Sequence, residues 1–146
     1  MHHIRNVGRG CACTALRKAS RAVTRLYDAA LTDSGMSVIQ FSILRNLARH
    51  GPFPLMELAD RLVMERTSLY RALNPLRRQG WVKLGDGEGR AKIAALTTRG
   101  QRALDDATGA WEAAQAGLLG KIGLDEWTQM ESSLARLVAV ATGDAA

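Results

Sequence analysis

The residues best suited to chemistry lie between positions 64 and 81, where the chain reads MERTSLYRALNPLRRQGW. If this stretch is helical, spacings of four, three and four residues place on one face Thr67, Arg71, Asn74 and Arg78. The opposite face is apolar and consists of Leu69, Ala72, Leu73 and Leu76. Arginine can bind guanine bidentately and asparagine can bind adenine, whereas hydroxyls and helix N-termini suit phosphates. The stretch therefore predicts a helix that reads duplex DNA, and its first turn adds Arg66 and Ser68 to the DNA-binding candidates.

Pro75 lies inside this helical pattern. Proline removes one backbone donor and crowds the carbonyl four residues earlier, which here belongs to Arg71. We expect a kink that separates a base-reading first half from a second half, ending at Arg77 and Arg78, that contacts the DNA backbone. The alternative is that the arginines form only a solvated helix face. The hairpin pattern that follows at once, with its own basic tip, favours the DNA interpretation.

The charge balance also points to an anionic partner. The chain has 146 residues and a net charge of +6. Residues 101–146 carry 3 basic and 7 acidic groups, so the excess of positive charge lies in the first two thirds. A basic domain suits nucleic acid or an anionic membrane surface, but the basic faces here lack the bulky apolar side chains that membrane insertion requires. No apolar run approaches the roughly 18–20 residues of a membrane span, and no signal peptide is visible. We therefore expect a cytoplasmic protein.

The elements that must position the basic helix follow from apolar spacing and from glycine and proline. Helices are predicted over residues 12–31, 37–50 and 55–63, ahead of the basic helix. Two strand-like runs, 81–84 and 91–96, flank a glycine-rich loop and predict a β-hairpin. Two heptad-like seams, from Leu104 to Leu118 and from Trp127 to Ala141, predict two further helices. The fold class expected is mainly α with a small β-hairpin wing, that is, a winged helix-turn-helix with a helical dimerisation region.

The segment MSVIQFSILRNLARHGPFPLMELADRLVMERTSLYRALNPLRRQGWV, followed by EGRAKIAALTTRG, resembles the MarR family of bacterial transcriptional regulators. The similarity extends over nearly the whole chain. We therefore interpret residues 1–146 as a single domain. Members usually carry Asp-x-Arg in the wing, followed by Leu-Thr and a glycine. Here the wing reads Glu88-Gly89-Arg90, and then come Leu96-Thr97 and Gly100. Glutamate in place of aspartate keeps the charge but changes its reach.

The resemblance implies a division of the chain and a mode of action. Residues 37–97 would form the DNA-binding winged helix-turn-helix, and residues 11–34 and 98–142 the dimerisation region. A homodimer would place two recognition helices in successive major grooves of a pseudo-palindromic operator, with the wings, including Arg90 and Lys92, reaching the minor groove. The family also implies a repressor that a small aromatic or phenolic acid releases from DNA. Arg17 and Arg21 are the candidates for binding the carboxylate of such an effector.

Cys11 and Cys13 lie where the first helix is expected to start. The helix N-terminus, Arg9 and Arg17 would lower the pKa of a thiol there. Three interpretations are open: small residues packed in the dimer interface, a redox sensor, or a metal site with His2 or His3. Residues two apart on a helix point about 200° away from each other, so oxidation would favour a sulfenic acid or a bridge between subunits over a Cys11–Cys13 disulfide. The packing interpretation is favoured, and no metal or cofactor is expected.

Two further possibilities have less support. Trp81, Trp111 and Trp127 could line an aromatic pocket, although tryptophans at such spacings are more often part of a core. An enzyme would need a nucleophile, a base and an acid, and nothing in the sequence brings Ser20, His50 and Asp60 together. The chain also has no glycine-rich phosphate loop, no HExxH and no paired CxxC. We therefore do not expect catalysis.

Overall fold

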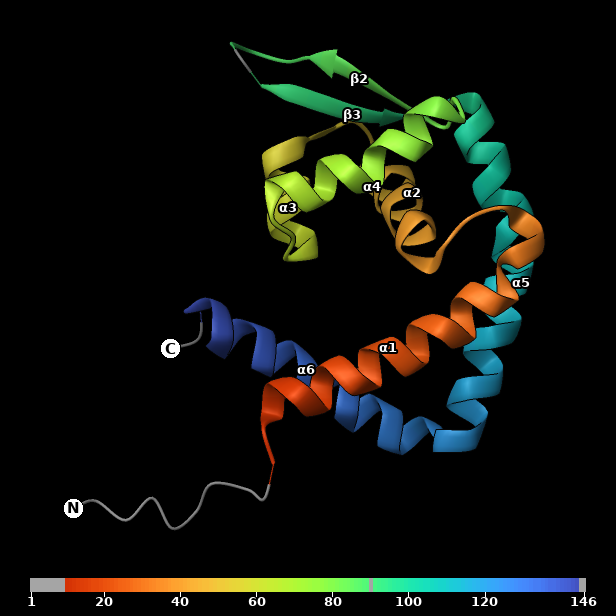
Figure 1. Cartoon of the computed structure of the whole chain (residues 1–146), viewed down its shortest axis with the longest axis vertical. Helices are drawn as coiled ribbons and strands as arrows, with labels where there is room; N and C mark the ends of the chain where they lie inside the picture. Colours follow the sequence, from red (N-terminus) through yellow and green to blue (C-terminus); the bar gives the residue numbers. More distant parts are fainter. Residues whose placement is uncertain (1–9, 90, 145–146) are drawn as a thin grey trace. The chain divides into compact units, whose positions relative to one another are not determined.

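The computed structural model describes residues 10–89 and 91–144 and is largely helical (Figure 1). The elements follow in the order α1 (Ala12–Ala30), the 3-10 helix η1 (Thr32–Ser34), α2 (Val38–His50), β1 (Phe53–Pro54), α3 (Leu55–Leu62), α4 (Arg66–Arg78), β2 (Val82–Asp86), β3 (Lys92–Leu96), α5 (Thr98–Ile122) and α6 (Leu124–Thr142). The chain divides after Trp111 into two compact units. All the helices that the spacing predicts are present, and the mainly helical winged fold is confirmed.

The start of α2 is fixed by Ser37, a residue type that is favoured as a helix N-cap. The Ser37 hydroxyl accepts from the backbone N–H of Gln40 at 3.2 Å, and the Gln40 side chain accepts from the backbone N–H of Ser37 at 2.9 Å. This reciprocal capping box satisfies two helix donors that would otherwise lack partners. A carboxylate oxygen of Asp28 accepts from the N–H of Val38 at 2.7 Å and ties the end of α1 to the start of α2.

The hairpin is part of a three-stranded antiparallel sheet in the order β1-β3-β2. The first strand, which the sequence did not predict, pairs Phe53 with Ala94 and Pro54 with Ile93. A two-residue strand has no alternation to detect, and its proline is tolerated because it lies at the sheet edge. The two long strands match the prediction to within two residues, β2 extending as far as Asp86 and β3 beginning at Lys92.

A leucine-rich core joins α2, α3 and α4. Its fully buried side chains include Leu44, Leu47, Leu58, Leu69, Leu73 and Leu76. The apolar spacing of α2 predicts one inward face made of Val38, Phe41, Leu44, Leu47 and Ala48. The last of these positions is wrong, because Ala48 is exposed and Ile43 is buried instead. The buried stripe on α2 is broader than the spacing of Phe41, Leu44 and Leu47 indicates, because α2 contacts helices and the sheet at once.

Helix α4 runs without interruption from Arg66 to Arg78 with Pro75 inside it. The backbone carbonyl of Pro75 accepts from the N–H of Gln79 at 3.0 Å, so hydrogen bonding resumes immediately after the proline. The predicted apolar face is confirmed, since Leu69, Leu73 and Leu76 are all buried. The kink expected at Pro75 stays a prediction.

Two helices leave most of their apolar side chains in solvent. Helix α1 has one buried residue, Tyr27, and helix α6 has none. The large exposed apolar residues of α6 are Leu124, Met130, Leu134, Leu137, Val138 and Val140. Across the described ranges, none of the helices combines the length and apolarity needed to cross a membrane. These apolar faces are long stripes on otherwise polar helices.

Two glycines of α5 give a matched test of how closely the start of this helix packs against Trp81. A Cβ on buried Gly100 would lie 2.1 Å from the backbone oxygen of Trp81, whereas one on Gly109 would meet nothing within 4 Å. We expect Gly100→Ala to destabilise the protein by about 1–3 kcal/mol, because backbone must move to admit the methyl group. Gly109→Ala should stabilise it by about 0.5–1 kcal/mol through helix propensity. Urea unfolding followed by circular dichroism measures both, and equal effects of the two changes would contradict the packing described.

Candidate nucleic-acid interface

The polar face of α4 lies wholly in solvent. Its three fully buried leucines turn inward, so the residues between them must turn outward. The structure leaves exposed all six α4 residues that the sequence nominates, namely Arg66, Thr67, Ser68, Arg71, Asn74 and Arg78. The helix begins after Glu65, whose side chain makes no capping hydrogen bond, so the first N–H groups of α4 are not satisfied by that residue. Together these groups can donate hydrogen bonds to an anionic partner.

Among the described residues, the arginines on this face have no carboxylate partner. No carboxylate among the described residues forms an ion pair with Arg66, Arg71 or Arg78. Unpaired guanidinium groups on a rigid helix can donate in a fixed fork geometry to guanine or to phosphate. The geometry therefore suits the DNA-reading role predicted from the sequence, and the assignment of individual residues to bases stays a prediction.

The wing carries an ion pair at the outer end of its two long strands. Asp86 and Lys92 are register partners on β2 and β3, and the Lys92 ammonium donates to an Asp86 carboxylate oxygen at 2.5 Å. This hydrogen bond, together with the charge of Lys92, lowers the pKa of Asp86, and the same pairing raises the pKa of Lys92. Lys92 must therefore exchange Asp86 for phosphate if it contacts DNA. Arg90 lies outside the described residues.

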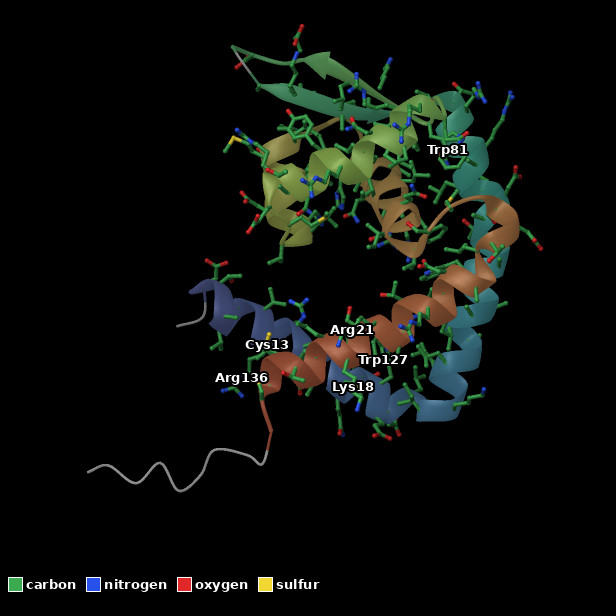
Figure 2. The ribbon with its side chains drawn as sticks, viewed as in Figure 1. Cys13, Lys18, Arg21, Trp81, Trp127 and Arg136 are labelled. Atoms are coloured by element: carbon green, nitrogen blue, oxygen red, sulfur yellow. The ribbon has the colours of Figure 1, made fainter. Side chains whose placement is uncertain are left out.

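Backbone and hydroxyl groups fix the wing to the end of α4. The N–H of Trp81 donates to the carbonyl of Leu76 at 2.9 Å, and the N–H of Thr97 donates to the carbonyl of Trp81 at 3.0 Å. The Thr97 hydroxyl donates to the carbonyl of Gly80 at 2.6 Å and accepts from the N–H of Gly100 at 3.0 Å. Trp81, labelled in Figure 2, is half-buried against the core at this joint. The wing and α4 are thus held as one body.

Two of the three tryptophans pack on the core of the first unit. Besides Trp81, Trp111 stacks on Phe41 with ring centroids 5.4 Å apart, and the Arg45 guanidinium carbon lies 4.2 Å from the centroid of the Trp111 ring. Trp127 is partly exposed on α6 in the second unit (Figure 2). Core packing is thus confirmed for Trp81 and Trp111, and the aromatic pocket considered from the sequence stays a prediction.

The remaining candidates lie on α1. Arg17 and Arg21 are exposed one turn apart, and neither pairs with a carboxylate among the described residues (Figure 2, Arg21). Cys11 and Cys13 are both exposed free thiols. The pKa of Cys11 is lowered chiefly by the backbone N–H of Thr14 and next by its hydroxyl, which favour the thiolate. The sequence attributed such a shift partly to Arg17, which does not contribute, and to Arg9, which lies outside the described residues.

The metal interpretation of these cysteines has no observable support. Within the described ranges, no three His, Cys, Asp or Glu side chains are grouped closely enough to hold a metal ion. His2 and His3, the proposed additional ligands, lie outside the described residues.

One basic feature of the structure is not predicted by the sequence pattern. An open hollow of about 540 Å³ lies where α4 meets β2, and it is lined by Asn74, Arg77, Arg78, Val82, Lys83 and Leu84. Strand alternation could have indicated Lys83, since it follows buried Val82 and must point to the opposite face. It could not have indicated that this face adjoins the last turn of α4.

Comparison with known proteins gives the same fold and a family. The sequence profile of the MarR family matches residues 34–92. The crystal structure of the transcriptional regulator MosR of M. tuberculosis in complex with DNA is 35% identical with a TM-score of 0.84, covering 92% of this chain and 98% of that one. None of the curated proteins matches this chain.

Two more distant structures share the fold. Sco5413, a MarR family transcriptional regulator from Streptomyces coelicolor, is 25% identical with a TM-score of 0.76, covering 91% of this chain and 94% of that one. CouR from Rhodococcus jostii RHA1, solved bound to p-coumaroyl-CoA, is 22% identical with a TM-score of 0.74, covering 84% and 88%. The profile match, the identity to MosR over nearly the full length and the exposed basic helix lead to one conclusion: this chain belongs to the MarR family of transcriptional regulators.

Proposed function

We propose that the chain is a repressor that binds a pseudo-palindromic operator as a homodimer and leaves it when an aromatic or phenolic acid binds. The observation that carries the DNA-binding part is α4, whose buried leucines direct Arg71, Asn74 and Arg78 into solvent, where the described residues offer them no carboxylate partner. Helices of this diameter fit the major groove of B-DNA, where arginine and asparagine distinguish guanine and adenine. The wing, with Lys92 and Arg90, then contacts the minor groove.

The relation to MosR supports this assignment. MosR was solved in complex with DNA, and its similarity to this chain covers both chains almost completely. At 35% identity, a shared fold supports a shared mode of docking on DNA more strongly than it supports a shared operator sequence. The operator of this chain therefore has to be determined from the chain itself.

The exposed apolar faces support the homodimer. Helix α6 has 19 residues and no buried side chain, although it presents six large apolar residues. Helix α1 adds Leu16, Val23 and Leu26, all exposed. Exposed apolar helix faces of this kind are rare on monomers and are typical of an isologous interface between two copies.

The effector part rests on the family resemblance and on α1. Arg17 and Arg21, one turn apart and unpaired with carboxylates in the described part of the chain, can bind a carboxylate together. CouR was solved with p-coumaroyl-CoA, but at 22% identity it supports only the fold. An aromatic acid is therefore proposed as a class of effector, without a particular compound.

A second candidate function is thiol-based sensing, and one observation favours it. Cys11 and Cys13 are both exposed, and the Thr14 backbone N–H lowers the pKa of Cys11. The thiolate is the form that peroxides oxidise, so this position is more reactive than a buried cysteine. Packing of both thiols against the partner subunit would remove that exposure, and this is the favoured alternative.

The base-reading role of Arg71 can be separated from its charge. Arg71→Ala should cost about 1–3 kcal/mol on the selected operator and relax base preference, because a bidentate contact is lost. Arg71→Lys keeps the charge but not the fork, so it should relax preference while leaving the salt dependence nearly unchanged. Arg90→Ala should weaken binding with little change in major-groove preference. Anisotropy titrations over a panel of mutated operators measure all three, and identical profiles for the Arg71 and Arg90 variants would refute the assignment.

The dimer has its own test on α6. Leu134→Glu places a charge in the proposed interface, and the chain should become monomeric at micromolar concentration because the charge would be desolvated. Gln129→Glu is the matched control, since it adds the same charge on the same helix at an exposed polar position. Sedimentation velocity measures the mass, and circular dichroism checks that the variant stays helical. A parent protein that sediments as a monomer contradicts the homodimer.

Release by an aromatic acid and release by oxidation can be distinguished in one operator-binding assay. We expect aromatic acids at millimolar concentration to release the parent from its operator and to raise its melting temperature, because the ligand stabilises the state it binds. Arg21→Ala should blunt both effects, whereas Lys121→Ala, which removes an exposed positive charge from α5, should not. A modest excess of peroxide should release neither the parent nor the Cys11→Ser, Cys13→Ser double variant. Release of the parent alone by peroxide would instead establish the redox function.

A further inference from the structure

The hollow between α4 and β2 collects positive charge from two separate elements. Arg77 and Arg78 come from the last turn of α4, and Lys83 comes from β2. All three side chains are exposed, and none forms an ion pair with a carboxylate of the described chain. Asn74 adds a carboxamide, and the other two lining residues are the apolar Val82 and Leu84. The hollow thus contains three cations and no acid.

A second hollow in the same unit shows that this composition is not general. It lies beside the first turn of α4 and is lined by Glu57 and Asp60 as well as by Arg66 and Lys92. Acids and bases there offset one another, and Lys92 is further paired with Asp86. The hollow at the other end of α4 has no such compensation. Its like charges repel each other, and an anion that entered would remove that repulsion.

Local structure holds the three cations together. The N–H of Trp81 bonds to the carbonyl of Leu76, so the chain turns directly from α4 into β2. Val82 is buried beneath the joint and pairs with Leu96, which directs Lys83 outward. Asn74 and Arg78 line the hollow and also lie on the exposed polar face of α4, so the cluster is continuous with that face.

We propose that this hollow binds a backbone phosphodiester of duplex DNA beside the bases that α4 reads, with Lys83 and Arg77 as contacts. The inference rests on the proposed function, since it needs α4 to lie against DNA. A phosphate fits the chemistry better than a base edge does, because lysine acts as a point charge and the hollow offers several donors. Arg78 and Asn74 belong both to the polar face and to this hollow, so one DNA molecule can occupy both.

The first test is the salt dependence of binding to a 30-base-pair duplex of arbitrary sequence. Lys83→Gln and Arg77→Gln should each reduce the log–log slope by about 0.9 per bound protomer, as expected for one lost phosphate contact. Lys83→Arg keeps the charge and should restore the slope. Lys121→Gln removes the same charge from exposed Lys121 on α5 and should leave the slope unchanged. All substituted side chains are exposed, and thermal unfolding checks each fold.

The second test locates the contact. The protein first selects a binding duplex from a random-sequence pool, and single phosphates of this duplex are then replaced by neutral methylphosphonates. At least one replacement should weaken the parent but leave Lys83→Gln unaffected, since its partner is already gone. If every replacement weakens the two proteins equally, the inference is wrong. If the parent binds no duplex DNA, the proposed function itself fails, and the two failures are thereby distinguished.

The remaining alternative is that the hollow binds a free phosphate compound and not a phosphodiester of DNA. Melting temperatures in inorganic phosphate and in chloride at matched ionic strength address it. A stabilisation by phosphate that requires Lys83, with an unchanged DNA salt slope in Lys83→Gln, would show that the hollow binds free phosphate and would overturn the DNA assignment. If phosphate does not stabilise the protein and Lys83→Gln reduces the DNA salt slope, the DNA assignment is supported.

Discussion

Burial of Leu69, Leu73 and Leu76 is the constraint on which the rest of the molecule depends. All three are fully buried, and full burial of a leucine contributes about 1.5–3 kcal/mol. Rotating α4 about its axis would expose these side chains and would force arginines into the core, where their desolvation is costly. The rotation of the helix is therefore fixed, and with it the direction of every polar side chain that can contact DNA. The packing of these leucines thus decides which side chains of α4 are available for DNA recognition.

The joint at Trp81 extends this constraint to the wing. Hydrogen bonds between Trp81, Leu76, Thr97 and Gly80 leave the hairpin little freedom relative to α4. Helix α4 and the wing can therefore contact two surfaces of one duplex without a separate entropic cost for orienting each of them. The same joint creates the cationic hollow, because it brings Lys83 next to the end of α4.

The two ends of the wing differ in electrostatics. At the joint, Lys83 has no acidic partner in the described chain, whereas further out Lys92 is held by Asp86. An exposed ion pair of this kind contributes little to stability, and it competes with phosphate for the same ammonium. The net gain from a Lys92 contact with DNA is accordingly smaller than from an unpaired lysine. The basic surface thus has strong and weak positions that a count of charges does not distinguish.

The sequence by itself determined the family, the helices, the hairpin and the polar face of α4, because these follow from local periodicity, caps and glycines. The cap at Ser37 is an example, since it depends on a residue only three positions away. Only the tertiary structure decided which distant residues meet. The edge strand Phe53–Pro54, the exposed position of Ala48 and the Asp86–Lys92 pair all depend on the sheet and on its neighbours. Lys83 joined Arg77 for the same reason: non-local packing places side chains together that no spacing along the chain relates.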